Sequence, residues 1–110
     1  MRLPNPERAH LGDKLQGYVL NPLHREGKHK ARVFESVLGI TLDNQEILRR
    51  AILHAAGTSE DVEARGDQGH GALFVLRFPL VTAKGRASVL TAWIVRNGED
   101  FPRLTTCYIL

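Results

Sequence analysis

The sequence predicts an α+β domain in which two N-terminal helices pack on one face of a three- to four-stranded antiparallel meander. Two observations predict this fold. Apolar residues recur at helical spacing up to Gly57, and beyond it they alternate with a period of two, which is typical of half-buried strands. The connections between the expected strands are short, which favours antiparallel neighbours. A chain of 110 residues is long enough for one core, so residues 1–110 are interpreted as a single domain.

Residues 1–12 contain Pro4 and Pro6 and show no periodicity. They predict an irregular N-terminal arm that places Leu3 or Leu11 against the core. Tyr18 follows a short turn, and its expected role is packing rather than chemistry.

The first helix is predicted over residues 28–38. Pro22 cannot continue a preceding helix, Gly27 permits a tight turn, and Gly39 is a typical C-terminal cap. A second helix is predicted from Thr41 or Asp43 to Gly57, because Asp43 and Glu46 have the spacing of a capping box. The apolar positions expected to face the core here are Ile47, Leu48, Ala51, Ile52 and Ala55.

Four strands are expected after Gly57. Residues 60–65 are charged, which is typical of an edge strand. Residues 72–80 alternate, and Pro79 is expected to end regular pairing. Residues 86–95 are apolar on both faces, which predicts a central strand. In residues 103–110, one face should carry Leu104, Thr106, Tyr108 and Leu110, and the other Arg103, Thr105, Cys107 and Ile109. The most buried side chains should include Phe34, Leu38, Ile52, Phe74, Val89 and Trp93.

Composition limits the functional classes. Net charge is +3 with a pI of 9.4, which is compatible with a local surface that attracts polyanions. No apolar run reaches the ~20 residues of a transmembrane helix, and no secretory leader is visible, so no membrane partner is predicted. Cys107 has no partner for an internal disulfide. The expected location is the cytoplasm, although a toxin domain delivered as part of a larger chain would also lack its own leader.

Cations crowd the start of the first predicted helix. Lys28, His29 and Lys30 lie where unpaired N–H groups already favour an anion, so they predict a phosphate-binding site, with His24 beside it. The alternative is a solvated basic surface. Acidic residues gather elsewhere, at Glu60, Asp61, Glu63, Asp67, Glu99 and Asp100.

Other chemistries find little support. Zinc would need several Cys or His residues at ligand spacing, and the pair His24 and His29 has no matching pair downstream. No P-loop or dinucleotide fingerprint is present. We therefore predict neither a metal nor a cofactor, and we interpret Cys107 as a packed thiol.

Metal-free acid–base chemistry on RNA remains. His24 or His29 would move a proton near neutral pH, and Lys30 and Arg103 would stabilise the phosphorane. Thr105 or Tyr108 would position an oxygen. We expect Arg103 or Thr105 to share one groove with His24. Each residue also has a structural interpretation: His24 caps a turn, Arg103 pairs with Asp100, Thr105 favours a strand, and Tyr108 packs in the core.

The patterns YVLNPLHREGKHKARVF, TAWIV and PRLTTCYIL resemble a family of uncharacterised bacterial domains of unknown function, found alone or at the ends of toxin-like proteins. The order of helices and strands is also similar to the group of metal-free ribonucleases and toxins that includes barnase, EndoU, the tRNA-cleaving colicins and RelE. That resemblance implies an RNase-like site, carried over to His24, His29, Lys30, Arg103, Thr105 and Tyr108.

The leading hypothesis is a small RNA-directed domain, a toxin-type endoribonuclease that acts without metal. Its expected partners are RNA and a small acidic inhibitor protein. The alternative is a noncatalytic protein-interaction module.

Overall fold

The structure, a computed structural model, describes all 110 residues. After a 3-10 helix, Pro6–Arg8, and a π-helical turn, Leu15–Val19, the first α-helix is α1, Gly27–Val33, which continues as a π-helical turn, Phe34–Leu38. A 3-10 helix, Leu42–Asn44, precedes α2, Glu46–Thr58. The strands are β1 (Glu63–Asp67), β2 (Gly71–Val81), β3 (Arg86–Arg96) and β4 (Arg103–Ile109).

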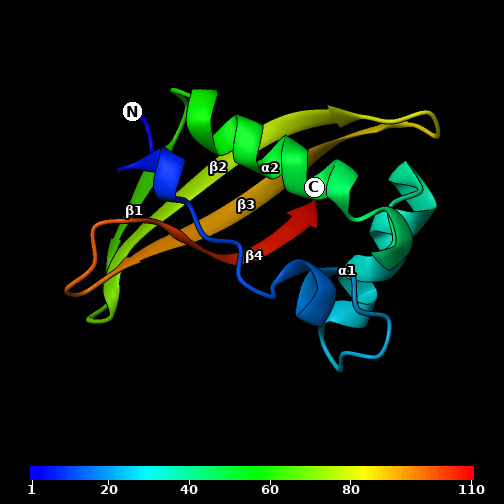
Figure 1. Cartoon of the computed structure of the whole chain (residues 1–110), viewed down its shortest axis with the longest axis horizontal. Coiled ribbons are helices and arrows are strands. Elements are labelled where there is room, and N and C mark those ends of the chain that lie inside the picture. The colour runs from blue at the N-terminus through cyan, green and yellow to red at the C-terminus, as the bar shows by residue number, and fades with distance from the viewer.

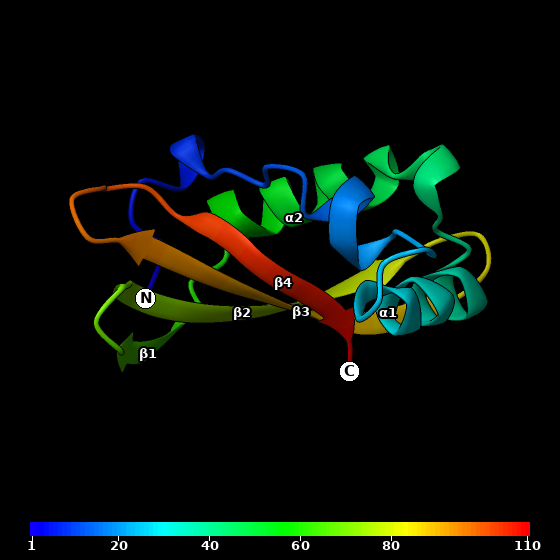
Figure 2. The same ribbon diagram turned by 90° about the horizontal axis from the view of Figure 1, so that it is seen from below.

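The four strands form one antiparallel sheet in the order β1-β2-β3-β4, so the α+β class with helices N-terminal to a meander is confirmed. Helix α2 lies across one face of the sheet, whereas α1 lies beside the end where β4 finishes (Figures 1 and 2). The opposite face of the sheet carries no helix (Figure 2). Strand β3 is central and β1 is a fully exposed edge, as predicted.

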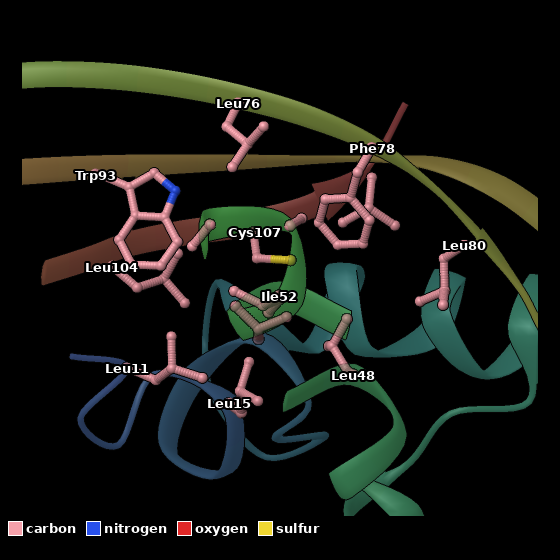
Figure 3. Packing of buried hydrophobic residues seen from close by; sticks show 14 of the residues in the cluster. Leu11, Leu15, Leu48, Ile52, Leu76, Phe78, Leu80, Trp93, Leu104 and Cys107 are labelled. Atoms are coloured by element: carbon pink, nitrogen blue, oxygen red, sulfur yellow. The ribbon is translucent and has the colours of Figure 1, made fainter. Parts of the chain in front are cut away.

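All six predicted core residues are buried, none more than 8% exposed. Leu48 and Ile52 of α2 point toward Leu76, Phe78 and Cys107 of the sheet (Figure 3). Burial on α2 falls on Leu48, Ile52, Ala55 and Ala56, whereas Ile47, expected on this face, is 43% exposed. The helical period therefore predicted the burial of Leu48, Ile52 and Ala55 correctly and misplaced Ile47.

The N-terminal arm is tied along the outer edge of β4. His10 forms a parallel bridge with Arg103, its N–H donates to Pro102 O at 2.9 Å, and Leu104 N–H donates to His10 O at 2.9 Å. Leu3 and Leu11 are both buried, which confirms the expected role of the arm.

Three local predictions are corrected. The helix that follows Gly39 is introduced by a capping box between Thr41 and Asn44 rather than between Asp43 and Glu46, because the intervening turn is 3-10. The first helix is α-helical only to Val33. Pro79 does not end pairing, since β2 stays in register with β3 to Val81. Proline is tolerated there because β1 pairs with β2 no further than Val75, which leaves that side of β2 free at Pro79.

A bulge in β4 corrects the predicted faces of the last strand. Trp93 pairs with Leu104 and Ala92 with Thr106, so Thr105 is the extra residue. Leu104 and Cys107 therefore both face the core, although the alternating pattern put them on opposite faces. Thr106 and Tyr108 face the side of the sheet without a helix. The Thr105 hydroxyl is occupied by a hydrogen bond to Ala92 O at 3.0 Å.

Candidate functional site

Helix α1 begins in direct contact with Tyr18. A Cβ added to Gly27 would lie 1.9 Å from the Tyr18 carbonyl oxygen, so only glycine allows this approach. His24 caps the helix start, since its Nδ1 accepts hydrogen bonds from the N–H groups of Glu26 (3.0 Å) and Gly27 (2.9 Å). Nδ1 thus carries no proton, and a neutral ring has its proton on Nε2. His24 has the capping role that was the structural alternative, and it occupies two amides of the region predicted to bind phosphate.

Lys30 extends from α1 between two tyrosine rings. Its Nζ lies 5.1 Å from the centre of the Tyr18 ring and 5.9 Å from that of Tyr108. Lys30 forms no ion pair with a carboxylate. A half-buried ammonium that is held by aromatic faces and has no carboxylate partner remains available to an incoming anion.

The same contact alters Tyr18. The Lys30 ammonium, which approaches the phenol, lowers the pKa of Tyr18 below its ordinary value of 10.0, partly opposed by burial. Thr106 also lowers this pKa. A phenol whose pKa is lowered by a neighbouring cation is a better proton donor than an ordinary tyrosine.

The Thr106 hydroxyl lies in the same region, on the side of β4 that faces away from α2. Its Oγ1 is buried and makes no hydrogen bond of ordinary geometry, and the Tyr18 phenol, whose pKa Thr106 lowers, is its polar neighbour. Unpaired buried polar atoms are uncommon in folded proteins and occur at functional sites. Thr106 thus joins Tyr18 and Lys30 as a candidate site residue.

A cleft of about 320 Å³ opens between α1 and the end of β4. It brings together three of the predicted residues, His29, Lys30 and Tyr108, with Val33 and Ile109 as its apolar walls. His29 is exposed and Lys30 half-buried. We name this space the Lys30 cleft.

Arg103 lies outside the Lys30 cleft, which corrects its predicted place beside the helix start. On β3 its partner is Ile94 whereas that of Tyr108 is Leu90, a separation of about 13 Å along the strand. Its guanidinium bonds both Glu99 oxygens, at 2.9 and 2.8 Å, and this contact lowers the pKa of Glu99. The arginine therefore pairs with Glu99, not with Asp100, which pairs with Arg8 at 2.6 Å.

Lys28 is also separated from Lys30, because it lines a different cleft on the other flank of α1. The predicted phosphate set Lys28, His29 and Lys30 is thereby divided between two clefts. Sequence spacing alone did not show this division.

Ion pairs distinguish the two charged regions. The six ion pairs include Glu63 with Arg65 and Arg77, Glu99 with Arg103, and Asp100 with Arg8. None includes the four cations of the helix start, Arg25, Lys28, Lys30 and Arg32. Glu63, Glu99 and Asp100 of the predicted acidic region are therefore paired, whereas the four cations around the start of α1 are not.

Cys107 is fully buried, and burial raises the pKa of its thiol to about 12, which leaves it protonated and unreactive. No three His, Cys, Asp or Glu side chains gather where they could hold a metal ion. None of the helices has the length and apolar character needed to cross a membrane.

Sequence reasoning missed Tyr18 and Thr106 as site residues. Tyr18 is far along the chain from Thr106 and Tyr108, which both lie on β4, and only the packing of the Leu15–Val19 turn and α1 against β4 brings the three together. The one signal in the sequence was Gly27, since a glycine at a helix start can indicate close approach of another backbone segment.

No curated protein and no solved structure matches the chain. One family, described as Domain of unknown function (DUF6883), matches residues 2–110. Because this match spans nearly the whole sequence, the chain belongs to the DUF6883 family.

Proposed function

We propose that this protein is a small RNA-directed domain that cleaves RNA without a metal ion, with its reaction centre around Lys30, where the Lys30 cleft borders Tyr18. The observation that carries the proposal is the Lys30 ammonium, held between Tyr18 and Tyr108 without a carboxylate partner. Cleavage of RNA through its own 2′-hydroxyl needs a base, an acid and a cation near the phosphate. His29, Tyr18 and Lys30 are groups of those three kinds.

In the proposed step, His29 accepts the proton of the 2′-hydroxyl while the 2′-oxygen forms a bond to the adjacent phosphorus. The bond from phosphorus to the 5′-oxygen breaks, and Tyr18 donates its proton to that leaving oxygen. Lys30 stabilises the charge of the phosphorane and that of the phenolate left on Tyr18. The products are a 2′,3′-cyclic phosphate and a free 5′-hydroxyl, and water returns the protons to their starting places.

The test is incubation of the purified protein with total RNA in EDTA. We expect discrete fragments with 2′,3′-cyclic phosphate ends from the wild type. Lys30→Met and Tyr18→Phe should each reduce cleavage by about a hundredfold, the scale of a lost acid, base or charge-stabilising group. Arg96→Gln is the matched control, since Arg96 is an exposed cation at the far end of β3. This variant should cleave RNA as the wild type does. Absence of fragments, or cleavage that Lys30→Met leaves unchanged, contradicts the proposal.

A noncatalytic interaction module is the second candidate, and the bare face of the sheet favours it. Leu73 pairs with Ile94 and Val75 with Ala92 on that face, and all four side chains remain partly exposed. Apolar side chains on an uncovered sheet face are typical of a protein-binding surface. An acidic inhibitor partner would instead bind the unpaired cations of α1. The same RNA incubation separates the two candidates, because a binding module produces no fragments.

A further inference from the structure

A second and larger cleft, of about 420 Å³, lies on the other flank of α1. It is bounded by α1, the segment around the Asn21-Pro22 turn and the 3-10 helix Leu42–Asn44. Its lining residues are Leu20, Pro22, Lys28, Ala31, Arg32, Glu35, Thr41, Leu42 and Asp43. We name this space the Arg32 cleft.

Helix geometry explains why the two clefts are separate. Lys28, Ala31, Arg32 and Glu35 are spaced at i, i+3, i+4 and i+7, so they form one stripe along the helix. His29, Lys30 and Val33 lie on the adjacent flank and line the Lys30 cleft. The helix body therefore stands between two cation-bearing surfaces.

The Arg32 cleft carries charges of both signs, and none of them is neutralised within the protein. Lys28 and Arg32 form no ion pair, and neither do Glu35 and Asp43. All four side chains are exposed. A ligand that satisfies both sets must combine an anionic group with hydrogen-bond donors.

The remaining walls are apolar. Leu20 and Ala31 are buried beneath the cleft, and Leu42 is half-buried. Together with Pro22 they offer a surface for a flat ring. The volume is within the range of sites for small molecules, which is roughly 300–1,000 Å³.

We propose that the Arg32 cleft binds a nucleotide. Lys28 and Arg32 bind its phosphate, since a guanidinium and a neighbouring ammonium provide charge-assisted hydrogen bonds to phosphate oxygens. The base packs on the apolar wall around Pro22 and Leu42. Asp43, with Glu35 nearby, accepts hydrogen bonds from an amino group on the base, as carboxylates do with cytosine.

Two sources can supply such a nucleotide. One is a free mononucleotide, and the other is a nucleotide unit of the RNA strand whose neighbouring phosphate reaches the Lys30 cleft. The second source rests on the proposed function, whereas the first does not.

The experiment follows backbone amide signals by NMR during titration with 5′-CMP, 5′-UMP, cytidine and a short 2′-deoxy oligonucleotide that this chemistry cannot cleave. We expect 5′-CMP to shift signals along the Arg32 cleft and to bind about tenfold more tightly than cytidine, which has no phosphate. Binding of CMP should exceed that of UMP, and Asp43→Asn should remove this preference. If the oligonucleotide also shifts signals of the Lys30 cleft, the source is a strand; if only the mononucleotide binds, the source is free nucleotide.

Variants test the residues. The double variant Lys28→Met, Arg32→Gln should weaken CMP binding by about tenfold or more, and Arg96→Gln should not change it. All of these side chains are exposed, so the variants should fold, which circular dichroism checks. The proposal is overturned if CMP shifts no signals of this cleft at millimolar concentration, or if Lys30→Met weakens CMP binding as much as the double variant does. Failure of RNA cleavage with intact CMP binding would refute the proposed function alone.

Discussion

Gly27 and Tyr18 are in such close backbone contact that no other residue fits at the start of α1. A Cβ on Gly27 would lie 1.9 Å from the Tyr18 carbonyl oxygen and 2.7 Å from its carbonyl carbon. Both atoms belong to the backbone and cannot rotate away. The contact fixes α1 beside Tyr18 and thereby sets the position of Lys30 over the Tyr18 ring.

Gly27→Ala should therefore destabilise the domain by about 1–3 kcal/mol, the cost of overpacking, and should separate Lys30 from Tyr18. Urea unfolding measures the first effect. Gly57→Ala is the matched control, because Gly57 lies in α2 and no atom is near its added Cβ. This variant should be more stable than the wild type by about 0.5–1 kcal/mol of unfolding free energy. Equal stability of Gly27→Ala and wild type would contradict the contact.

Tyr18 should ionise at lower pH than an ordinary tyrosine, because Lys30 lowers its pKa. In a Tyr108→Phe background Tyr18 is the single tyrosine, so absorbance at alkaline pH reports it alone. Lys30→Met should raise the midpoint. Because the folded pKa is lowered, this contact adds stability above the unfolded pKa of about 10, and that added stability is lost as pH falls through the folded pKa. A midpoint insensitive to Lys30→Met would show that the ammonium does not contact the phenol.

Arg103→Met should leave RNA cleavage within about twofold of wild type in the assay in which Lys30→Met should reduce it about a hundredfold. The reason is that Arg103 lies about 13 Å along the strand from Tyr108 and is paired with Glu99. The same substitution should raise the pKa of Glu99 toward its ordinary value, since Arg103 is what lowers it. Loss of RNA cleavage in Arg103→Met would contradict this prediction and would indicate that Arg103 takes part in the proposed reaction.

Phe34→Ala should cost about 3–5 kcal/mol of unfolding free energy, because Phe34 is fully buried and its removal leaves a cavity. Leu53→Ala is the control, an apolar residue of α2 that is 41% exposed, and it should change stability by about 0.5 kcal/mol or less. Denaturant unfolding measures the unfolding free energy of both variants. Similar losses of stability in the two would refute the assignment of the core.

Cys107 should resist thiol reagents in the native protein and react only on unfolding, because burial raises its pKa to about 12. The unfolded thiol ionises above about pH 8.5, where the folded thiol does not, so stability should decrease as pH rises beyond that value. The chain has one cysteine, so reagent absorbance measures this site alone. Rapid labelling under native conditions would contradict the burial.

The strands and the core were predictable because they depend on local alternation. Phe74, Val89 and Trp93 fall on one face whatever the details of the turns, and β3 had to be central because both its faces are apolar. The bulge at Thr105 was not predictable, since an inserted residue leaves no mark in composition yet reverses the faces that follow it.

The site was only partly predictable for a related reason. His29, Lys30 and Tyr108 were singled out because cations and aromatic residues carry chemistry wherever they lie, and the structure places all three in one cleft. The capping role of His24 was one of two open interpretations, and only the hydrogen bonds from the Glu26 and Gly27 N–H groups to its Nδ1 reveal it. Arg103 was misplaced because the order of residues along β4 does not indicate which end α1 approaches.

The bridge between His10 and Arg103 also bears on how the protein behaves at high concentration. The arm occupies backbone groups at the start of β4's outer edge, and α1 lies beside the end of that strand. At the opposite edge, β1 is five residues long, fully exposed and charged. Short charged edges and covered edges both prevent a strand of another molecule from joining a sheet. Concentrated solutions should accordingly resist the growth of cross-β aggregates by strand addition.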